Sequence, residues 1–305
     1  MKKVLLLLLG ILFGLLVMEL FARLTIPLHR EFYLGLNNKY GEEIEREANS
    51  LGFRDFKHEF KKPEGVKRIL VVGDSIAAGW GVRFNQTFAR QLEKKFKNVE
   101  VIVLARPGWD AMKEIATIEE LGMKFAPDLI IIGYCLNDPI DPRDLLRFYR
   151  KMAYKKPEGI NKFFFEHSML FRFIWKISQD ERVKREFIKC MEKIHTDKYR
   201  GWKETIDAYN KLRKITEEKH IPVIVVLFPS LDFSFEHYPF LRVHRRVESL
   251  MKAEGFIFVD LLPYLKKYKN TQLVADEIDR HPNKIVHSLV ADILYDIIVK
   301  KHLLQ

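Results

Sequence analysis

Hydrophobic positions in this chain fall into short apolar runs that alternate with longer amphipathic stretches. Runs rich in β-branched residues predict strands at 68–73, 99–104, 129–134, 222–228 and 256–260. Apolar residues recur at helical spacing over 86–97, 111–124, 203–219, 240–254 and 284–301. Strands that alternate with helices in this way predict a parallel sheet with helices on both faces. Because crossovers between parallel strands are right-handed, few strand orders are possible, and we expect a five-stranded, flavodoxin-like α/β sheet.

The N-terminal stretch has a different pattern, because residues 4–18 carry only apolar side chains and glycine behind two lysines. Such a run is long for the core of a signal peptide and slightly short for a membrane span. The small-residue cleavage pattern before Ala22 is incomplete. We therefore expect residues 1–22 to form an uncleaved hydrophobic anchor helix, with the rest of the chain outside the cytoplasm. The alternative is a signal peptide that is cleaved to release a secreted protein.

The pattern after this helix indicates three further segments. Residues 23–65 are polar with scattered aromatic residues, and we expect a connector that lies on the domain formed by residues 66–305. Residues 49–54 within the connector look like a turn that forms an edge of the functional site. Between about 139 and 200 no strand is predicted, which indicates a helical insertion over the strand ends. The aromatic residues at 163–176 predict either core packing beneath the insertion, or an acyl-binding or membrane-facing surface.

Composition restricts the class of protein further. A chain of 305 residues can bury one large core with an appendage. The net charge of +11 fits solvated helix faces rich in Lys and Glu, and the alternative is attraction to anionic lipid headgroups or an acidic polymer. Because the basic residues are scattered and no binding motif is present, we do not expect nucleic acid as a partner. Cys135 and Cys190 are expected to be packed thiols, and no Cys/His cluster has metal-ligand spacing.

The turn after the first predicted strand carries a candidate nucleophile, Ser75, in the sequence Gly73-Asp-Ser75. In an open α/β sheet, ligands bind beyond the carboxyl ends of the strands, which is where this turn lies. The turn lacks the lysine of a Walker loop, the spacing of a dinucleotide-binding loop and the second glycine of a Gly-x-Ser-x-Gly elbow. Taken alone, the tripeptide also fits a plain turn, so its meaning depends on its partners.

Candidate partners follow the other predicted strands. A serine nucleophile needs a base, and acyl transfer also needs donors for the oxyanion. Gly108, after the second strand, lets a backbone N–H approach a ligand, and the Asn137 amide, after the third, is a neutral donor. His281 precedes Pro282, which we expect in the first turn of the last helix, so His281 lies on an extended segment. Asp279, two residues earlier, then shares a face with His281 and can orient its imidazole.

These blocks together resemble a known family. Gly73-Asp-Ser75, Gly108, Asn137-Asp138 and Asp279-x-His281, in that order, are similar to the motifs of the SGNH (GDSL-type) hydrolases, over about residues 66–305. The hydrophobic segment at residues 1–22 also resembles the N-terminal segments of membrane-anchored members of this family. The resemblance implies a three-layer α/β/α fold and ester-cleaving or acyl-transfer chemistry without metal or cofactor. It makes Ser75 the nucleophile, His281 the general base and then acid, and Asp279 the residue that orients the histidine. The implied oxyanion hole consists of the Ser75 and Gly108 N–H groups and the Asn137 side chain.

The chain departs from the family pattern at the acid. The family often places an aspartate three residues before the histidine, where this chain has Ile278. Asp279 is the expected substitute, Asp276 is the alternative, and a Ser–His dyad is a third arrangement. Val286 stands where a glycine is often found, which we expect to affect only helix packing.

The resulting functional prediction is a serine esterase that uses a Ser-His-Asp mechanism with an acyl-enzyme intermediate. It would hydrolyse small acyl esters, acetyl in the first instance, on a carbohydrate or lipid outside the cytoplasm. One alternative is an O-acyltransferase that acts on cell-surface polysaccharide. Another is a non-catalytic carbohydrate-binding protein of the same fold.

Overall fold

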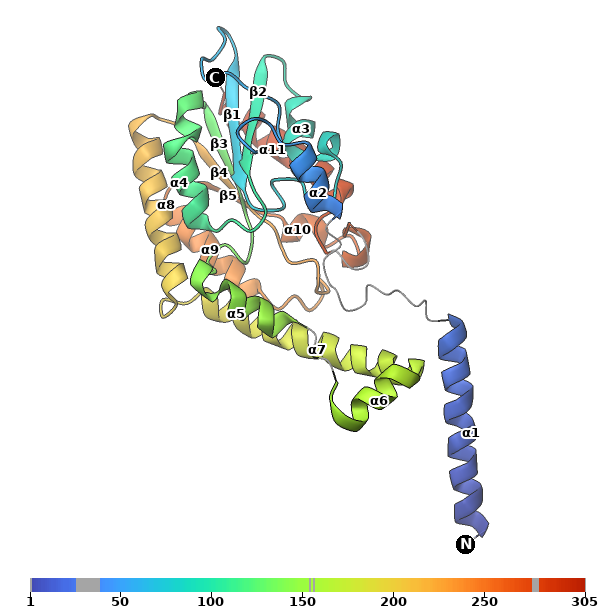
Figure 1. Cartoon of the computed structure of the whole chain (residues 1–305). Helices are drawn as coiled ribbons and strands as arrows, with labels where there is room; N and C mark the ends of the chain where they lie inside the picture. The colour runs from blue at the N-terminus through green and yellow to red at the C-terminus, as the bar shows by residue number, and fades with distance from the viewer. Residues whose placement is uncertain (1, 26–38, 154, 156, 276–279, 305) are drawn as a thin grey trace. The chain divides into compact units, whose positions relative to one another are not determined.

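The computed structural model of the protein describes residues 2–25, 39–153, 155, 157–275 and 280–304 (Figure 1). The chain divides into two compact units. One comprises Met1–Gly35 and Leu146–Cys190 and is helical in its described residues, so we call it the helical unit. The other comprises Leu36–Leu145 and Met191–Gln305 and contains the sheet, so we call it the sheet unit.

The sheet unit is built on a five-stranded parallel sheet in the order β2-β1-β3-β4-β5. Its strands are β1 (Lys67–Gly73), β2 (Val99–Ala105), β3 (Leu129–Tyr134), β4 (Val223–Leu227) and β5 (Ile257–Asp260). β1, β3 and β4 are buried almost throughout, as expected for strands covered on both faces. Gly73 pairs with Ala105 in β2 and with Gly133 in β3, so these three strands end at the same level. The predicted flavodoxin-like sheet is confirmed.

Helices cover both faces of the sheet and complete three layers (Figure 1). On one face, α3 (Phe88–Glu93) packs against α11 (Lys284–Lys300). On the other face, α4 (Ala111–Glu120) packs against α8 (Arg200–Glu218), and α9 (Leu241–Ala253) lies along β5. The unit also contains short helices, which are α2 (Lys39–Arg46), α10 (Leu262–Leu265), η2 (Phe84–Gln86), η3 (Gly122–Phe125) and η4 (Asn270–Gln272).

Capping side chains set where the helices beside the site begin. α3 begins after Thr87, whose side chain accepts a hydrogen bond from the Arg90 N–H, and Asp110 caps α4 in the same way. α11 begins after Asn283, whose side chain accepts from the Ile285 N–H. The prediction that Pro282 lies in the first turn of this helix is therefore wrong. Pro282 precedes the cap and forms an isolated antiparallel bridge with Val274, where its fixed φ suits an extended chain.

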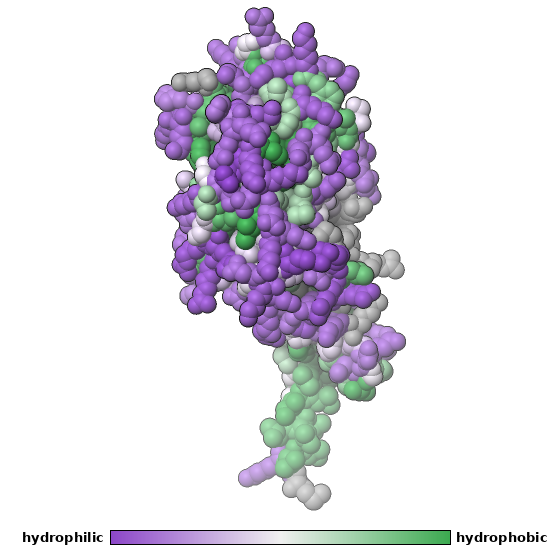
Figure 2. All heavy atoms as spheres, turned by 90° about the vertical axis from the view of Figure 1, so that its left-hand side faces the viewer, coloured by the Kyte–Doolittle hydropathy of each residue, from purple (hydrophilic) through white to green (hydrophobic). Residues whose placement is uncertain are grey.

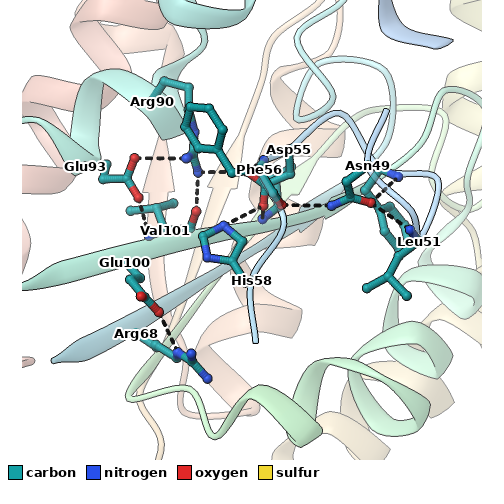
Figure 3. A network of polar contacts seen from close by, with 12 residues as sticks. Asn49, Leu51, Asp55, Phe56, His58, Arg68, Arg90, Glu93, Glu100 and Val101 are labelled. Carbon is teal, nitrogen blue, oxygen red and sulfur yellow. Dashed lines mark hydrogen bonds and ion pairs between the residues drawn. The ribbon is translucent and has the colours of Figure 1, made fainter. Parts of the chain in front are cut away.

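The segment after α2 covers the free edge of β2 (Figure 3). The Asp55 carboxylate accepts a hydrogen bond of 2.7 Å from the Val103 N–H and lies 3.3 Å from the Arg90 guanidinium. His58 also lies 3.3 Å from this carboxylate. An exposed strand edge is a template for unwanted pairing, and here a side chain occupies its hydrogen-bonding position.

The helical unit contains α1 (Lys2–Thr25), α6 (Gly159–His167) and most of α7 (Met169–Ile194). α5 (Pro142–Met152) begins in the sheet unit and ends in the helical unit. Among the described residues, α1 is the one helix that is long and apolar enough to cross a membrane. Its apolar side chains are exposed, and Figure 2 shows its surface as almost continuously hydrophobic. The described residues between 139 and 200 form helices and no strand.

Candidate active site

The turn after β1 presents Ser75 at the carboxyl end of the sheet. β1 ends at Gly73, where a Cβ atom would lie 3.1 Å from the carbonyl oxygen of Gly133, so a side chain here would crowd the neighbouring strand. Asp74 then closes the turn, because its Oδ1 accepts a 3.0 Å hydrogen bond from the Ile76 N–H. Ser75 follows with its side chain half-buried. A tight strand-to-turn junction of this kind holds the hydroxyl in one place.

His281 meets Ser75 at this position. The Oγ atom of Ser75 lies 2.9 Å from Nε2 of His281, although the two residues are 206 positions apart in the chain. The histidine segment is anchored by the Ala275 N–H, which donates to the carbonyl of His281 over 2.8 Å. The ring of Trp80 lies against the imidazole, with 5.6 Å between ring centroids. A hydroxyl that donates to Nε2 requires the ring proton on Nδ1, the tautomer that a general base needs.

Neither candidate for the acid is placed by the structure. Asp279 and the alternative Asp276 both lie outside the described residues. The choice between these carboxylates, and the Ser–His dyad as the third arrangement, therefore stays a prediction.

Gly108 and Asn137, the proposed oxyanion donors, follow the strands on either side of β1. Gly108 has a φ of +79°, in the left-handed region that favours glycine, and the Arg106 N–H just before it donates to the carbonyl of Gly73 over 3.3 Å. The Nδ2 atom of Asn137 lies 3.4 Å from Oδ2 of Asp74. The structure thus ties both segments to the turn that carries the serine. Their roles as donors stay a prediction.

A cluster of buried acids lies directly behind this turn. The Cys135 thiol donates to Oδ1 of Asp74 over 3.1 Å, and the Cys135 N–H donates to Oδ2 of Asp138 over 3.0 Å. Glu114 of α4 is fully buried, and neither of its carboxyl oxygens has a hydrogen-bond partner among the described residues. Burial and the nearby Asp74 carboxylate raise the pKa of Glu114 well above its ordinary value. Burial and then the Glu114 carboxylate do the same to the pKa of Asp138.

Three atoms of this cluster are close enough to hold one metal ion, an arrangement that sequence spacing did not reveal. One ligand atom from each of Asp74, Cys135 and Asp138 lies within 4.8 Å of the others. The thiol, however, donates a hydrogen bond to Asp74, and burial raises the pKa of Cys135 well above its ordinary value. Because the thiolate is the form that binds metals, the group fits a hydrogen-bonded cluster around a protonated thiol better than a metal centre.

Arg54 is hydrogen-bonded to the turn that carries Ser75, a role that the sequence did not assign to it. Its Nη1 atom donates to the carbonyl of Gly79 over 2.7 Å and to that of Val82 over 3.0 Å. Its other nitrogens face the Glu47 carboxylate at 2.6 Å. Only 3% of the Arg54 surface is exposed. The turn at 49–54 was expected to form an edge of the site, and an arginine at its end is the signal that could have identified this contact.

Comparison with known proteins adds the family. The model of the GDSL-like lipase/acylhydrolase family matches residues 71–289. Among solved structures, a two-domain esterase active on acetylated mannans matches 77% of this chain with 14% identity and a TM-score of 0.46, and this chain covers 49% of that protein. A lipase/acylhydrolase from Enterococcus faecalis has 12% identity and a TM-score of 0.44, with 77% of this chain and 97% of that chain covered. An acetyl xylan esterase has 14% identity and a TM-score of 0.45, with 76% and 99% covered. No curated protein matches this chain.

The sheet order, the covering helices and a serine–histidine contact at the carboxyl edge define an α/β fold of the SGNH type. The matched segment contains the serine turn, the glycine and asparagine segments and the histidine. The chain therefore belongs to the GDSL-like lipase/acylhydrolase family.

Proposed function

We propose that the protein is a serine esterase that hydrolyses small acyl esters on a carbohydrate or lipid. The observation that carries the proposal is the 2.9 Å contact between Ser75 Oγ and His281 Nε2. Serine is a poor nucleophile unless a base removes its proton, and this contact supports His281 as that base because it lies within hydrogen-bonding reach.

The reaction would proceed in two steps. Ser75 Oγ attacks the ester carbonyl carbon while its proton moves to Nε2 of His281. The bond to the leaving alkoxide then breaks, the alkoxide takes the proton from His281, and an acyl-serine ester is left. In the second step His281 removes a proton from water, the water oxygen attacks the acyl carbon, and Ser75 leaves with that proton as the free acid is released. A carboxylate at Asp279, or at Asp276, would orient the imidazole through Nδ1.

The oxyanion formed in each step needs donors that are already in place. We assign this role to the N–H groups of Ser75 and Gly108 and to the Asn137 amide. Two contacts support the assignment, since Asn137 is held near Asp74 in the serine turn and the segment before Gly108 is hydrogen-bonded to Gly73. Neutral donors suit this position because they stabilise the negative charge of the oxyanion but do not attract another anion to the site before the reaction.

For the substrate we propose an acetyl or other short acyl ester on a carbohydrate or lipid. Trp80 supports a sugar-bearing substrate, because its ring is only half-buried and lies beside His281. An aromatic side chain at the mouth of a site gives a flat, partly apolar surface on which a sugar ring can lie. A series of chromogenic esters from acetate upward tests the acyl length, and a rise in activity with chain length would contradict the choice of acetate.

We further propose that α1 anchors the enzyme in a membrane with the sheet unit outside the cytoplasm. Its length and apolar surface support a membrane span, and the lysines at positions 2 and 3 favour a cytoplasmic N-terminus. Cleavage of the segment, which would release a secreted enzyme, is the alternative. Mass spectrometry of the mature protein from its membrane fraction separates the two.

Substitution of the nucleophile tests the chemistry. Ser75→Ala is expected to lower kcat for p-nitrophenyl acetate by about 10³-fold or more, because residual rate then comes only from binding and oxyanion donors. Ser249→Ala is the matched control, since this hydroxyl donates to a carbonyl within α9 and should have no effect. Full activity of Ser75→Ala would contradict the proposal. A product assay with a sugar acceptor completes the test, because acylated sugar in excess of free acid would identify a transferase instead.

A further inference from the structure

The helical unit exposes large apolar side chains on both α6 and α7. They are those of Ile160, Phe163 and Phe164 on α6 and of Phe173, Ile174 and Ile177 on α7, and each of the six is between 43% and 68% exposed. Positions 160, 163 and 164 follow the i, i+3, i+4 spacing of one helix face, and 173, 174 and 177 also lie on one side of their helix. We call these six residues the apolar face. Large aromatic residues gathered in this way mark an interaction surface.

α1 is hydrogen-bonded to the helices that carry this face. The Glu19 carboxylate of α1 accepts from the N–H groups of Met169 and Leu170, each over 2.9 Å, and from the Ser168 hydroxyl over 2.7 Å. These are the first N–H groups of α7, which have no partner within the helix. Arg23 adds a 2.8 Å hydrogen bond to the carbonyl of His167 at the end of α6. The junction between α6 and α7 is therefore tied to the C-terminal part of α1.

The position of Glu19 along α1 sets the depth of this junction. The apolar run at 4–18 spans about 22 Å at 1.5 Å per residue, which is less than the hydrocarbon core of about 30 Å. The next residue, Glu19, is charged, and Arg23 lies one turn further on. If α1 spans a bilayer, these charged groups lie at its boundary, where charged side chains are tolerated. The α6–α7 junction then lies at the same level.

Charge indicates which surface the face meets. Residues 159–177, which comprise α6 and the first part of α7, contain Lys162, Arg172 and Lys176 but only one acid, Glu166, a net charge of +2. Exposed apolar side chains accompanied by basic residues are the composition of a helix that lies in the headgroup region of an anionic membrane.

We propose that α6 and the first half of α7 lie in the headgroup region of the bilayer that α1 spans. The apolar face points toward the acyl chains, the basic residues meet anionic headgroups, and Glu19 holds the α6–α7 junction at that depth. The inference rests on the proposed membrane anchorage but not on the ester chemistry. The inference extends the membrane contact from α1 alone to a surface formed by α1, α6 and α7.

Lipid quenching measures the depth of single positions in the full-length protein. In a Cys190→Ser background, where the remaining Cys135 is buried, the variants Phe163→Cys and Ile174→Cys carry an environment-sensitive fluorophore. The protein is placed in vesicles of phosphatidylcholine and phosphatidylglycerol that contain nitroxide-labelled lipids. Leu12→Cys reports on α1, and two exposed positions serve as controls, Lys184→Cys in α7 and Val299→Cys in the sheet unit.

We expect shallow nitroxides to quench positions 163 and 174 at least threefold more than positions 184 and 299, and deep nitroxides to quench position 12. Replacing phosphatidylglycerol by phosphatidylcholine should reduce quenching at 163 and 174. Glu19→Ala should also reduce quenching at 163 and 174 without changing quenching at position 12. Asp180→Ala, which removes an acid from an ion pair within α7, should leave quenching at 163 and 174 unchanged.

Three results would overturn the inference. Quenching at 163 and 174 no greater than at 299, with position 12 quenched, would show that α1 is inserted and that the apolar face is not in the membrane. Blue-shifted fluorescence at 163 and 174 without lipid quenching would show that a second protein surface covers the face. No quenching at position 12 would refute the membrane anchorage itself and this inference with it, while leaving the esterase proposal to its own test.

Discussion

Arg54 offers a direct test of how the structure holds the turn that carries Ser75, the proposed nucleophile. The side chain is almost completely buried and donates to the carbonyls of Gly79 and Val82, which follow the serine in the same turn. Arg54→Leu keeps only the first part of the apolar stem and removes both hydrogen bonds. The carbonyls would then be left in an interior that water reaches poorly, beside a Glu47 carboxylate that has lost its partner.

The expected magnitude follows from these contacts. A hydrogen bond that involves a charged group contributes about 1.5–3 kcal/mol, and Arg54 makes two of them to carbonyls. The ion pair to Glu47 adds little, because that carboxylate is 38% exposed and screened by solvent. We therefore expect the free energy of unfolding to fall by about 3 kcal/mol or more. A nucleophile displaced by about 1 Å can lose about 10²-fold in rate, so we expect a large loss in kcat with a smaller change in KM.

Urea unfolding and esterase kinetics on the same samples check both parts. Arg54→Lys should recover part of the stability and activity, because a lysine can reach one carbonyl but not two in the same geometry. Arg242→Leu, at an exposed position of α9, is the matched control and should change neither. Wild-type stability and kcat in Arg54→Leu would refute the idea that this arginine positions the turn.

Three further predictions concern Glu114, His287 and Asn137. Burial raises the pKa of Glu114, so the folded state holds its proton more tightly and the free energy of unfolding falls as pH rises between the unfolded and folded pKa values. Glu114→Gln should thus gain stability relative to the wild type as pH rises from about 4 to 8, and parallel urea curves would contradict this. Burial, and then the Arg54 charge, lower the pKa of His287 to about 3, so the free energy of unfolding should fall as pH drops below about 6.5, the ordinary pKa of a histidine. His287→Asn, which keeps an acceptor for the Phe88 N–H, should flatten that loss. Asn137→Ala should lower kcat by about 10²–10³-fold with little change in KM, and an unchanged kcat would remove Asn137 from the oxyanion hole.

The sheet could be predicted from the sequence because its strands are buried on both faces. Runs such as Ile69–Val72 have no polar positions and therefore show no periodicity. Their short length and β-branched composition identify them as buried strands instead. The strand order followed from the right-handed crossover rule and was confirmed. The helix boundaries were less accurate, since a local side chain such as Thr87 or Asn283 decides where each helix begins.

The candidate site was predictable where its residues follow strands or, as with His281, belong to a motif that resembles the family's. Ser75, Gly108 and Asn137 each come shortly after a strand, so the parallel sheet gathers them at one edge. Arg54 could not be assigned in this way, because its segment precedes the sheet and an arginine at the end of the 49–54 turn does not by itself show which backbone carbonyls it contacts. The contact between Cys135 and Asp74 depends on the register of β1 and β3 and was also not foreseen. The acid at Asp279 or Asp276 stays a prediction.

Covalent labelling tests the central claim most directly. A fluorophosphonate probe reacts with a serine only when a base activates it, so the full-length protein should form one adduct, which peptide mass spectrometry should locate on Ser75. His281→Ala should abolish the adduct although the serine is still present, since it removes the partner at 2.9 Å. An absent adduct, or an adduct on another serine, would contradict the account of this protein as a serine esterase.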